Sequence, residues 1–422
     1  MTPPVEVGVP ANSRRAGVLM ACIGARQHYE VPVILHRAGL LRRLIVDSWN
    51  RWGYGMRRVA NLTRLGWLKG FAGRYREELP ARLVVSLGRF GIRYWLRCQQ
   101  ARNRAALYGV FEQEGRRFAE ECIKHLDVEH SVFFGYSSAS LEVLRREKKS
   151  GRWCVLDQID PARTEYRIVL EEEARFPDLV ADASPIPESY FRRLEAEWDE
   201  ASLIVVNSEW SKRALVEQGV DPLKIVIVPL AFEGPPSGFD LAPRRSNPDD
   251  PLRVLWLGTL CLRKGLPYAL EAAKLLLRAP VRFTFAGPSQ VALEKLHLPE
   301  NCRYVGAVPR IDAHTLYTQH DVFLLPTLSD GFAITQIEAL AYGLPVISTP
   351  CCGDVVEDGK CGFLVPPRDG RSIAESILKF VEDRDLLCQM SIQARKRARE
   401  FSPQRLCHRW LAVVGANPAN AR

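Results

Sequence analysis

The stretch DGFAITQIEALAYGLPVISTPCCGDVVEDGKCGFLVPP, residues 330–367, decides the fold of this chain. It begins with an Asp-Gly pair, continues through an alanine-rich segment that Gly343 ends, and leads into a short branched apolar run. This order predicts a loop, a helix and then a buried strand of a parallel sheet. Because Thr335 and Glu338 have the spacing of a capping box, we expect Glu338 to lie in the first turn of the helix.

The predicted helix start suits a ligand that carries both phosphate and hydroxyl groups. A helix N-terminus at the carboxyl end of a parallel sheet offers free backbone N–H groups and a partial positive charge, which favour phosphate. Asp330 and Glu338 stand eight positions apart, and their carboxylates accept hydrogen bonds, as sugar hydroxyls require. The two features together indicate a nucleotide sugar.

A wider set of residues resembles a known family. The pattern acidic-Gly-Phe-x5-Glu-Ala-x-Ala-x-Gly-x-Pro-Val-Ile begins at Asp330, and a Val-Val pair, an Asp-Gly turn and Leu-Val-Pro-Pro follow it. It resembles the C-terminal domain of the retaining glycosyltransferases of GT-B fold, called group 1 or family 4. Their Glu-x7-Glu motif has Glu where this chain has Asp330. The resemblance covers residues 203–402 well and the N-terminal half in general plan.

The resemblance implies an α/β protein with two Rossmann-like domains whose parallel sheets face an interdomain cleft. A length of 422 residues also favours two domains over one core. A segment rich in Pro, Gly and Asp predicts a linker at residues 231–250. We therefore expect an acceptor-binding domain at residues 1–230 and a nucleotide-sugar-binding domain at residues 251–402. A final helix at residues 403–422 is expected to cross back to the first domain.

The resemblance also implies roles for residues of the second domain. Asp330, with the backbone that follows it, is expected to hold the donor sugar, and Glu338 to accept from the ribose hydroxyls. Lys264 and Arg263 are expected to stabilise the leaving diphosphate, Arg263 in place of a family arginine whose position Thr259 occupies. Asp330 and Lys264 are thus predicted to be catalytic. The predicted donor-binding residues are Gly258, Thr259, Arg263, Lys264, Asp330, Gly331, Phe332, Ala333, Ile334 and Glu338.

The N-terminal half offers candidates at the ends of two predicted strands. Asp157 ends an apolar run at residues 153–157. By the resemblance, Asp157 or Gln158 takes the position where many relatives have a histidine that contacts the transferred sugar. A carboxylate there is either a catalytic group, as we predict, or a cap of the next turn. The loop after the first strand has a single glycine where GT-B enzymes usually have several. Its residues Gly24, Arg26 and His28 are predicted to face the acceptor or the cleft, although Arg26 and His28 suit structural roles equally.

Composition limits the class of protein further. No apolar run reaches the roughly 18 residues of a membrane span, and the start of the chain lacks the apolar core of a signal peptide, so we expect cytoplasmic residence. The 11 cysteines are scattered without a C-x-x-C pair, which predicts reduced thiols and no zinc site. No metal or other cofactor is expected, since cationic side chains and a helix terminus can neutralise a diphosphate.

Positive charge is concentrated near the N-terminus. Residues 1–110 contain 19 Lys and Arg against 5 Asp and Glu, although the whole chain has a net charge of only +9. Arg89, Arg93 and Arg97 follow one helical stripe, and aromatic residues are interspersed among the basic ones through residues 42–104. This segment fits an anionic membrane surface or a lipid-linked acceptor, and it fits a solvated helix face equally well. No nucleic-acid-binding motif accompanies the charge, so nucleic acid is not an expected partner.

The sequence therefore predicts a retaining hexosyltransferase-type glycosyltransferase. It would move a sugar from a nucleotide diphosphate sugar to a glycan or lipid-linked acceptor, at the membrane surface if the basic segment binds there. The chain contains neither G-x-G-x-x-G nor a Walker pattern, which argues against a dinucleotide-dependent oxidoreductase or a P-loop ATPase. Three alternatives stay open: a nucleotide-sugar epimerase of similar fold, a non-catalytic scaffold that binds a membrane or partner, and a nucleic-acid-binding protein.

Overall fold

The computed structural model describes residues 17–50, 71, 73–235 and 250–416. Its strands form two parallel sheets, as predicted, and their orders are β3-β2-β1-β4-β5-β6-β7 and β10-β9-β8-β11-β12-β13. The first sheet contains β1 (Val18–Cys22), β2 (Leu41–Val46), β3 (Val84–Ser86), β4 (Val132–Tyr136), β5 (Trp153–Asp157), β6 (Leu203–Val206) and β7 (Ile225–Ile227). The second contains β8 (Leu252–Leu257), β9 (Val281–Ala286), β10 (Cys302–Tyr304), β11 (Val322–Leu325), β12 (Val346–Ser348) and β13 (Gly362–Leu364).

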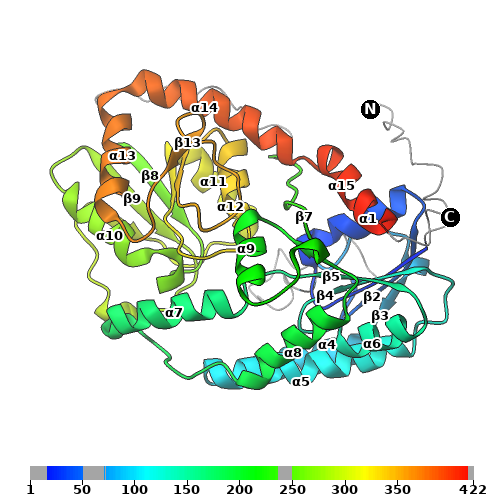
Figure 1. Ribbon diagram of the computed structural model, residues 1–422. Helices are drawn as coiled ribbons and strands as arrows, with labels where there is room; N and C mark the ends of the chain where they lie inside the picture. The colour runs from blue at the N-terminus through cyan, green and yellow to red at the C-terminus, as the bar shows by residue number, and fades with distance from the viewer. Residues whose placement is uncertain (1–16, 51–70, 72, 236–249, 417–422) are drawn as a thin grey trace.

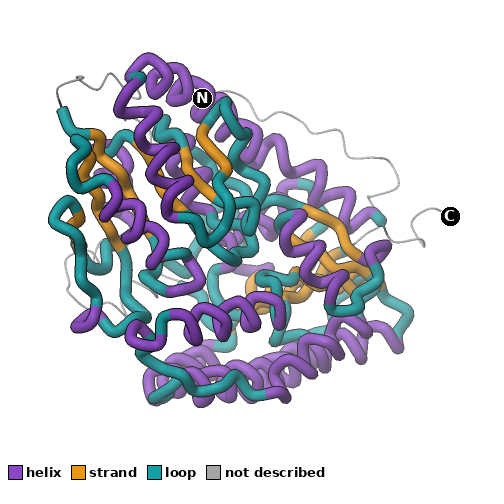
Figure 2. Tube along the Cα trace, turned by 60° about the vertical axis from the view of Figure 1, so that its left-hand side comes forward, coloured by secondary structure: helices purple, strands orange, loops and turns teal. Residues whose placement is uncertain are grey.

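Helices connect the parallel strands and cover both faces of each sheet, as Figure 2 shows. Around the first sheet lie α1 (Glu30–Arg37), α4 (Gly88–Gln100), α5 (Arg104–Ile123), α6 (Leu141–Lys149), α8 (Glu188–Glu200) and α9 (Glu209–Glu217). Helix α7 (Arg163–Arg175) follows β5 in sequence but packs against the second domain, where the Tyr268 hydroxyl donates to Glu172 at 2.7 Å. The helices that follow β8 are α10 (Leu266–Leu275), α11 (Arg310–Gln319), α12 (Ile334–Ala341), α13 (Gly370–Glu382), α14 (Arg384–Ala398) and α15 (Pro403–Gly415).

Each sheet lies between two apolar cores because its central strands are buried on both faces. The first sheet packs α1 and α15 on one face and α5, α6 and α8 on the other. The second packs α10 and α13 on one face and α12 with part of α14 on the other. Burial on both faces explains why the strands read as continuous apolar runs instead of alternating polar and apolar residues. These observations confirm the predicted fold of two α/β domains.

The last described helix lies against the first domain, although it follows the second domain in sequence. In Figure 1 α15 lies beside α1, and the two helices pack together. Trp410 of α15 is 1% exposed and meets Phe134 of β4 edge-on, with ring centroids 5.8 Å apart. The chain end therefore ties the two domains together through an apolar contact. Residues 417–422 of the expected final helix lie outside the described residues.

The basic N-terminal segment is partly neutralised within the fold. Arg93 and Arg97 of α4 and Arg117 of α5 all pair with Glu114, whose side chain is completely buried. The aromatic rings of Trp49 and Phe90 belong to the core, whereas Trp95 of the same segment is exposed. Residues 51–70 and 72 of the segment lie outside the described residues. In the part of the chain that the structure describes, no helix is long and apolar enough to cross a membrane.

The two sheets bring their carboxyl ends toward each other. The strand order reverses between β1 and β4 in the first sheet and between β8 and β11 in the second, and ligands of parallel α/β sheets bind at such switch points. The two ends are in contact, since the hydroxyl of Ser208 donates to the backbone oxygen of Gly331 at 2.7 Å. The candidate functional site therefore lies in the loops after these strands.

Candidate functional site

The loop after β8 places Lys264 at the second switch point. It contains a single helical turn, Leu262–Lys264, and ends at Gly265, which begins α10 with a left-handed φ of 76°. A Cβ at Gly265 would lie only 1.9 Å from the backbone oxygen of Pro326, so any other residue would push the loop away from β11. Gly258 leaves room for the Lys264 ammonium, which lies 3.3 Å from the position of an added Cβ. Thr259 is half-buried in the same loop.

Asp330 lies opposite Lys264 in the loop between β11 and α12. One carboxylate oxygen of Asp330, Oδ2, is 3.3 Å from the Lys264 ammonium and 3.7 Å from the Arg263 guanidinium. The other oxygen accepts from the backbone N–H groups of Phe332, at 3.4 Å, and Ala333, at 3.1 Å. Burial raises the pKa of Asp330, but the charges of Lys264 and Arg263 outweigh burial and hold it below the usual value. Asp330 is therefore an ionised group at the centre of the predicted donor site.

The backbone after Asp330 is arranged differently from the prediction. The N–H groups of Phe332 and Ala333, which we expected to hold the donor sugar, donate to the carboxylate of Asp330 itself. Ala333 adopts a left-handed φ of 45° before the half-buried Ile334 starts α12. Asp330 thus fixes the turn into the helix, which gives its side chain a structural role beside its place in the site.

The capping box predicted from Thr335 and Glu338 is wrong. Helix α12 has Ala333 as its N-cap, so Thr335 lies inside the first turn, with its buried hydroxyl oxygen lacking a hydrogen-bond partner within the described residues. Glu338 lies in the second turn and accepts from the hydroxyl of Tyr317 at 2.8 Å. The helix starts two residues earlier than a cap at Thr335 would allow, because the Asp330 carboxylate accepts from the backbone of the turn before it.

Arg263 contacts the N-terminal domain, which the sequence did not indicate. Its guanidinium donates to the Glu165 carboxylate of α7 at 3.3 Å and to the backbone oxygen of Ser329 at 2.5 Å. The Ser329 hydroxyl also donates to Glu165, at 3.1 Å. Burial raises the pKa of Glu165 to about 7, against the opposing charge of Arg263. Arg263 therefore connects the domains beside Asp330, and Glu165 is a site residue that the sequence analysis missed.

The Asp330–Gly331 loop also fits closely against the first domain. A Cβ at Gly331 would lie 2.4 Å from the backbone oxygen of Ile159 and 2.9 Å from the Asn207 amide nitrogen. The Asn207 amide donates to that same Ile159 oxygen at 3.1 Å, and the Trp210 indole donates to the Ser329 hydroxyl at 3.3 Å. Residues after β5 and β6 thus form the wall on which the Asp330–Gly331 loop rests.

Asp157 is a buried carboxyl at the end of β5. It is 6% exposed, and its Oδ2 atom has no hydrogen-bond partner among the described residues. Burial raises the pKa of Asp157 to about 7, and only the charge of Arg26 opposes the shift. Its neighbour Gln158, the other residue at this strand end, is held by the Trp198 indole at 2.9 Å and so has a structural partner. Asp157 is therefore a chemically unusual group at the end of β5, the strand next to the first switch point.

The loop after β1 has an unusual backbone. Gly24 donates its N–H to the buried Asp47 at 2.9 Å, and the next residues include Gln27, His28 and Tyr29 at left-handed φ values of 46°, 50° and 63°. Three successive residues other than glycine in this conformation are strained, and strain of this kind is concentrated at functional sites. Arg26 and His28 are exposed. The positive charge of Arg26 acts on Asp157 and opposes the rise of its pKa.

We predict that replacing Asp157 by Asn changes how stability depends on pH. Because the pKa of Asp157 is raised from 3.8 to about 7, the folded chain keeps a proton that the unfolded chain releases, so stability falls as pH rises through this window. Asp157→Asn removes this loss. At about 1.4 kcal/mol per pKa unit, the free energy of unfolding of the wild type should fall between pH 4 and 8 by on the order of 2–4 kcal/mol more than that of Asp157→Asn.

Urea unfolding of both proteins across that pH range measures the difference. Asp199→Asn, a matched change at an exposed aspartate of α8, should leave the pH profile of the wild type unchanged. Parallel profiles for the wild type and Asp157→Asn would show that the carboxyl titrates normally.

The structure thus brings Lys264, Asp330 and Arg263 together, and it places Asp157 on the opposite side of the contact between the domains. Glu338 lies on α12 behind this group, held by Tyr317. Within the described ranges, no group of three His, Cys, Asp or Glu side chains could hold a metal ion. The arrangement offers cations for an anionic ligand and carboxyl groups for hydroxyls.

The fold and the position of the site define the class of this protein as GT-B. The structure aligns with sucrose-phosphate synthase from Thermosynechococcus elongatus over 97% of this chain and 100% of that one, with a TM-score of 0.64 and 15% identity. It also aligns with HepE of Anabaena in complex with UDP and glucose over 95% of this chain and 100% of that one, with a TM-score of 0.57 and 13% identity. At such identities the likeness establishes the fold alone.

Sequence comparison adds the family. Residues 240–397 match the model of the glycosyl transferases group 1, the family that the sequence resembles. The putative colanic acid biosynthesis glycosyltransferase WcaL of Salmonella typhimurium is 28% identical over 233 residues, which are 50% of this chain and 55% of WcaL. The amylovoran biosynthesis glycosyltransferase AmsK of Erwinia amylovora is 25% identical over 302 residues, 67% of this chain and 68% of AmsK. The match to WcaL thus spans about half of that protein's length.

Proposed function

We propose that this protein is a retaining glycosyltransferase that moves a hexosyl group from a nucleotide diphosphate sugar to a glycan or lipid-linked acceptor. The observation that carries this proposal is the Asp330 carboxylate held 3.3 Å from the Lys264 ammonium at the second switch point. The family of residues 240–397, and relatives named for the biosynthesis of colanic acid and amylovoran, support it. The UDP and glucose bound to the structurally similar HepE support a nucleotide sugar as the donor.

The cations of the site suit the chemistry of the leaving group. As the glycosidic bond breaks, negative charge grows on the departing diphosphate, and Lys264 is placed to stabilise that charge. A bound diphosphate would compete with Asp330 for Lys264, and Asp330 would then turn its freed oxygen toward the donor sugar hydroxyls. We propose that Lys264, with Arg263 beside it, supplies this charge without a metal ion.

We propose that Asp157 acts on the transferred sugar from the side of the first domain. With its pKa raised to about 7, its carboxyl is partly protonated near neutral pH and can accept from or donate to a sugar hydroxyl. We propose that it contacts the donor sugar and that the Gly24 loop, with Arg26, faces the acceptor. Glu338, half-buried on α12, would bind the ribose hydroxyls.

A nucleotide panel tests the proposal. The melting temperature of the protein is measured with UDP, GDP, ADP and their common sugars, with EDTA present and absent. A nucleotide at about 100 times its dissociation constant adds roughly 2.7 kcal/mol of stability, which shifts the melting temperature clearly. Stabilisation by one nucleotide family, with EDTA present, is expected. If none of them stabilises the protein, the donor site is not functional and a scaffold role takes its place.

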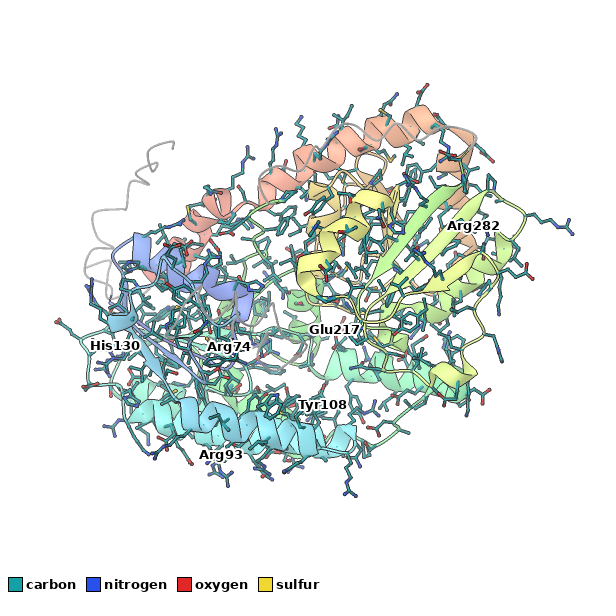
Figure 3. The ribbon with its side chains drawn as sticks, turned by 180° about the vertical axis from the view of Figure 1, so that it is seen from behind. Arg74, Arg93, Tyr108, His130, Glu217 and Arg282 are labelled. Carbon is teal, nitrogen blue, oxygen red and sulfur yellow. The ribbon has the colours of Figure 1, made fainter. Side chains whose placement is uncertain are left out.

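Part of α4 suits the membrane contact expected from the sequence. Ile92, Trp95 and Leu96 are 66%, 47% and 44% exposed on one face of this helix, beside the exposed Arg89 and Arg93. Figure 3 shows Arg93 on the outer side of the first domain. We propose that this face rests on an anionic membrane that carries the acceptor. Equal binding to neutral and anionic lipid vesicles in a sedimentation assay would contradict this contact. The cytoplasmic location expected from the sequence stays a prediction.

A further inference from the structure

A cavity lies beside the proposed donor site. Its volume is about 620 Å³. It is lined by the start of α5, by α7 and α8, and by the Arg263 loop with residues 290–291 of the second domain. In Figure 3 Tyr108 lies at the end of α5 that points toward the second domain. None of the roles proposed above uses this space, although its size is typical of a binding pocket for a small molecule or a few sugar units.

Aromatic rings form the wall of the cavity on the first domain. Tyr108 meets Tyr190 edge-on, with ring centroids 4.9 Å apart, and it meets Phe111 at 5.4 Å. Tyr166 and Phe191 stack at 5.5 Å. Arg104 lies over the Tyr166 ring at 5.5 Å and Arg163 over the Phe191 ring at 4.7 Å, so the half-buried rings of Tyr108 and Phe111 are the aromatic surfaces open to a ligand. Because Tyr190 fixes the Tyr108 ring, binding on it costs little conformational entropy.

Carboxyl groups lie at the inner end of the cavity. Asp160 and Glu165 both line it, and their charges act on the Tyr108 hydroxyl. Carboxyl groups accept hydrogen bonds from hydroxyls and, when protonated, also donate to them. Arg263 forms the wall between these groups and Asp330, whose Oδ2 lies 3.7 Å from the guanidinium. The cavity thus reaches to within one side chain of the predicted donor-sugar carboxylate.

The charges of the cavity disfavour a phosphate ligand. Arg104 is paired with Glu173, and its Nε donates to the backbone oxygen of Ser184 at 2.6 Å. Arg263 is paired with Glu165 at 3.3 Å. Arg102 is exposed at the rim. With its inner arginines neutralised and carboxyl groups beside them, the cavity suits a neutral ligand that has both apolar faces and many hydroxyls.

We propose that this cavity binds sugar units of the glycan acceptor that lie beyond the unit that reacts. A pyranose ring has an apolar C–H face that packs on an aromatic ring and an edge of hydroxyls that bond to carboxyl groups, and the cavity provides both. This inference rests on the proposed function and places part of the acceptor between α5, α7 and α8, away from the Gly24 loop. It makes Tyr108 and Tyr190 specificity-determining residues.

Ligand-observed NMR with linear glucose and galactose oligosaccharides of one to four units tests this proposal on the full chain. Two variants alter the cavity: Tyr108→Ala removes a wall, and Ala181→Trp fills the space from an exposed position at the rim. Ala183→Trp is the matched control, since Ala183 is exposed on the same loop and does not line the cavity. We expect binding to strengthen with length and to weaken about tenfold in both cavity variants, while the control binds as the wild type does.

UDP binding, measured on the same samples, separates this proposal from the proposed function. Unchanged UDP binding in the variants shows that they are folded and that the donor site is intact. Oligosaccharide binding that is equal in the wild type and both cavity variants would overturn the proposal, and so would binding of UDP without any oligosaccharide. If neither UDP nor any other nucleotide of the panel binds the wild type, the proposed function is overturned, and the oligosaccharide result alone judges the cavity.

Discussion

Lys264→Ala should lower the rate of sugar transfer by about 10²–10³-fold and remove most of the stabilisation by nucleotides. Lys264 is the ammonium closest to Asp330 and lies in the loop that begins at Gly258. A charge-assisted hydrogen bond contributes roughly 1.5–3 kcal/mol, and its value grows as charge develops on the leaving diphosphate. Steady-state transfer rates, together with the melting temperature in the presence of the nucleotide that stabilises the wild type, measure both effects.

The matched control for this variant is Lys274→Ala. Lys274 is an exposed residue of α10, the helix that begins just after the Lys264 loop, so both variants lose one positive charge from the same region. We expect Lys274→Ala to keep the nucleotide effect of the wild type. Asp330 loses a cationic partner in Lys264→Ala, so a small fall in stability without nucleotide is also expected. Nucleotide stabilisation that persists in Lys264→Ala would show that the diphosphate binds elsewhere.

Gly331→Ala should lower transfer by about 10–100-fold and leave nucleotide binding largely intact. The added methyl group would lie 2.4 Å from the Ile159 oxygen, a distance that real side chains do not reach. The Asp330–Gly331 loop must therefore move away from the first domain. A shift of about 1 Å in a reacting group can cost roughly 10²-fold in rate. Lys264 and Glu338, which we propose contact the nucleotide, both lie within the second domain, so nucleotide binding should survive.

Transfer rates and nucleotide-dependent melting temperatures of Gly331→Ala therefore separate domain contact from donor binding. Gly88→Ala is the control, because Gly88 begins α4 and an added Cβ there meets no atom within 4 Å. This control should transfer sugar at the wild-type rate. A transfer rate for Gly331→Ala within twofold of the wild type would mean that the closed contact between the domains is not the arrangement in which transfer occurs.

Much of the fold could be predicted from local patterns. Apolar runs bounded by turn residues predicted strands, and those at residues 153–157 and in the stretch after Gly343 are the observed β5 and β12. The patterns were accurate because buried parallel strands are apolar over their whole length, which periodicity detects directly. The pattern failed at the start of α12, where Thr335 and Glu338 have capping-box spacing but Asp330 makes the bonds to the backbone.

The site was predicted less completely than the fold. Lys264 and Asp330 were predicted from the resemblance to a known family, and the structure places the two side chains 3.3 Å apart. Glu165 was missed because it lies 98 residues from Arg263 along the chain and has no local signal. Arg263, expected to act beside Lys264 on the diphosphate, contacts Glu165 and Ser329, so its position joins the domains as well.

The two parallel sheets, the resemblance of the second domain to a known family and the loops that hold Lys264 and Asp330 could all be inferred from the amino-acid sequence. Those features depend on residues close together along the chain, whose spacing and apolarity are visible without a structure. Three features became visible only in the folded chain: Gly331 packs against Ile159, Glu165 pairs with Arg263, and an aromatic cavity lies beside them. These contacts join residues more than 90 positions apart, and they arise from how the two domains meet, which no local periodicity specifies.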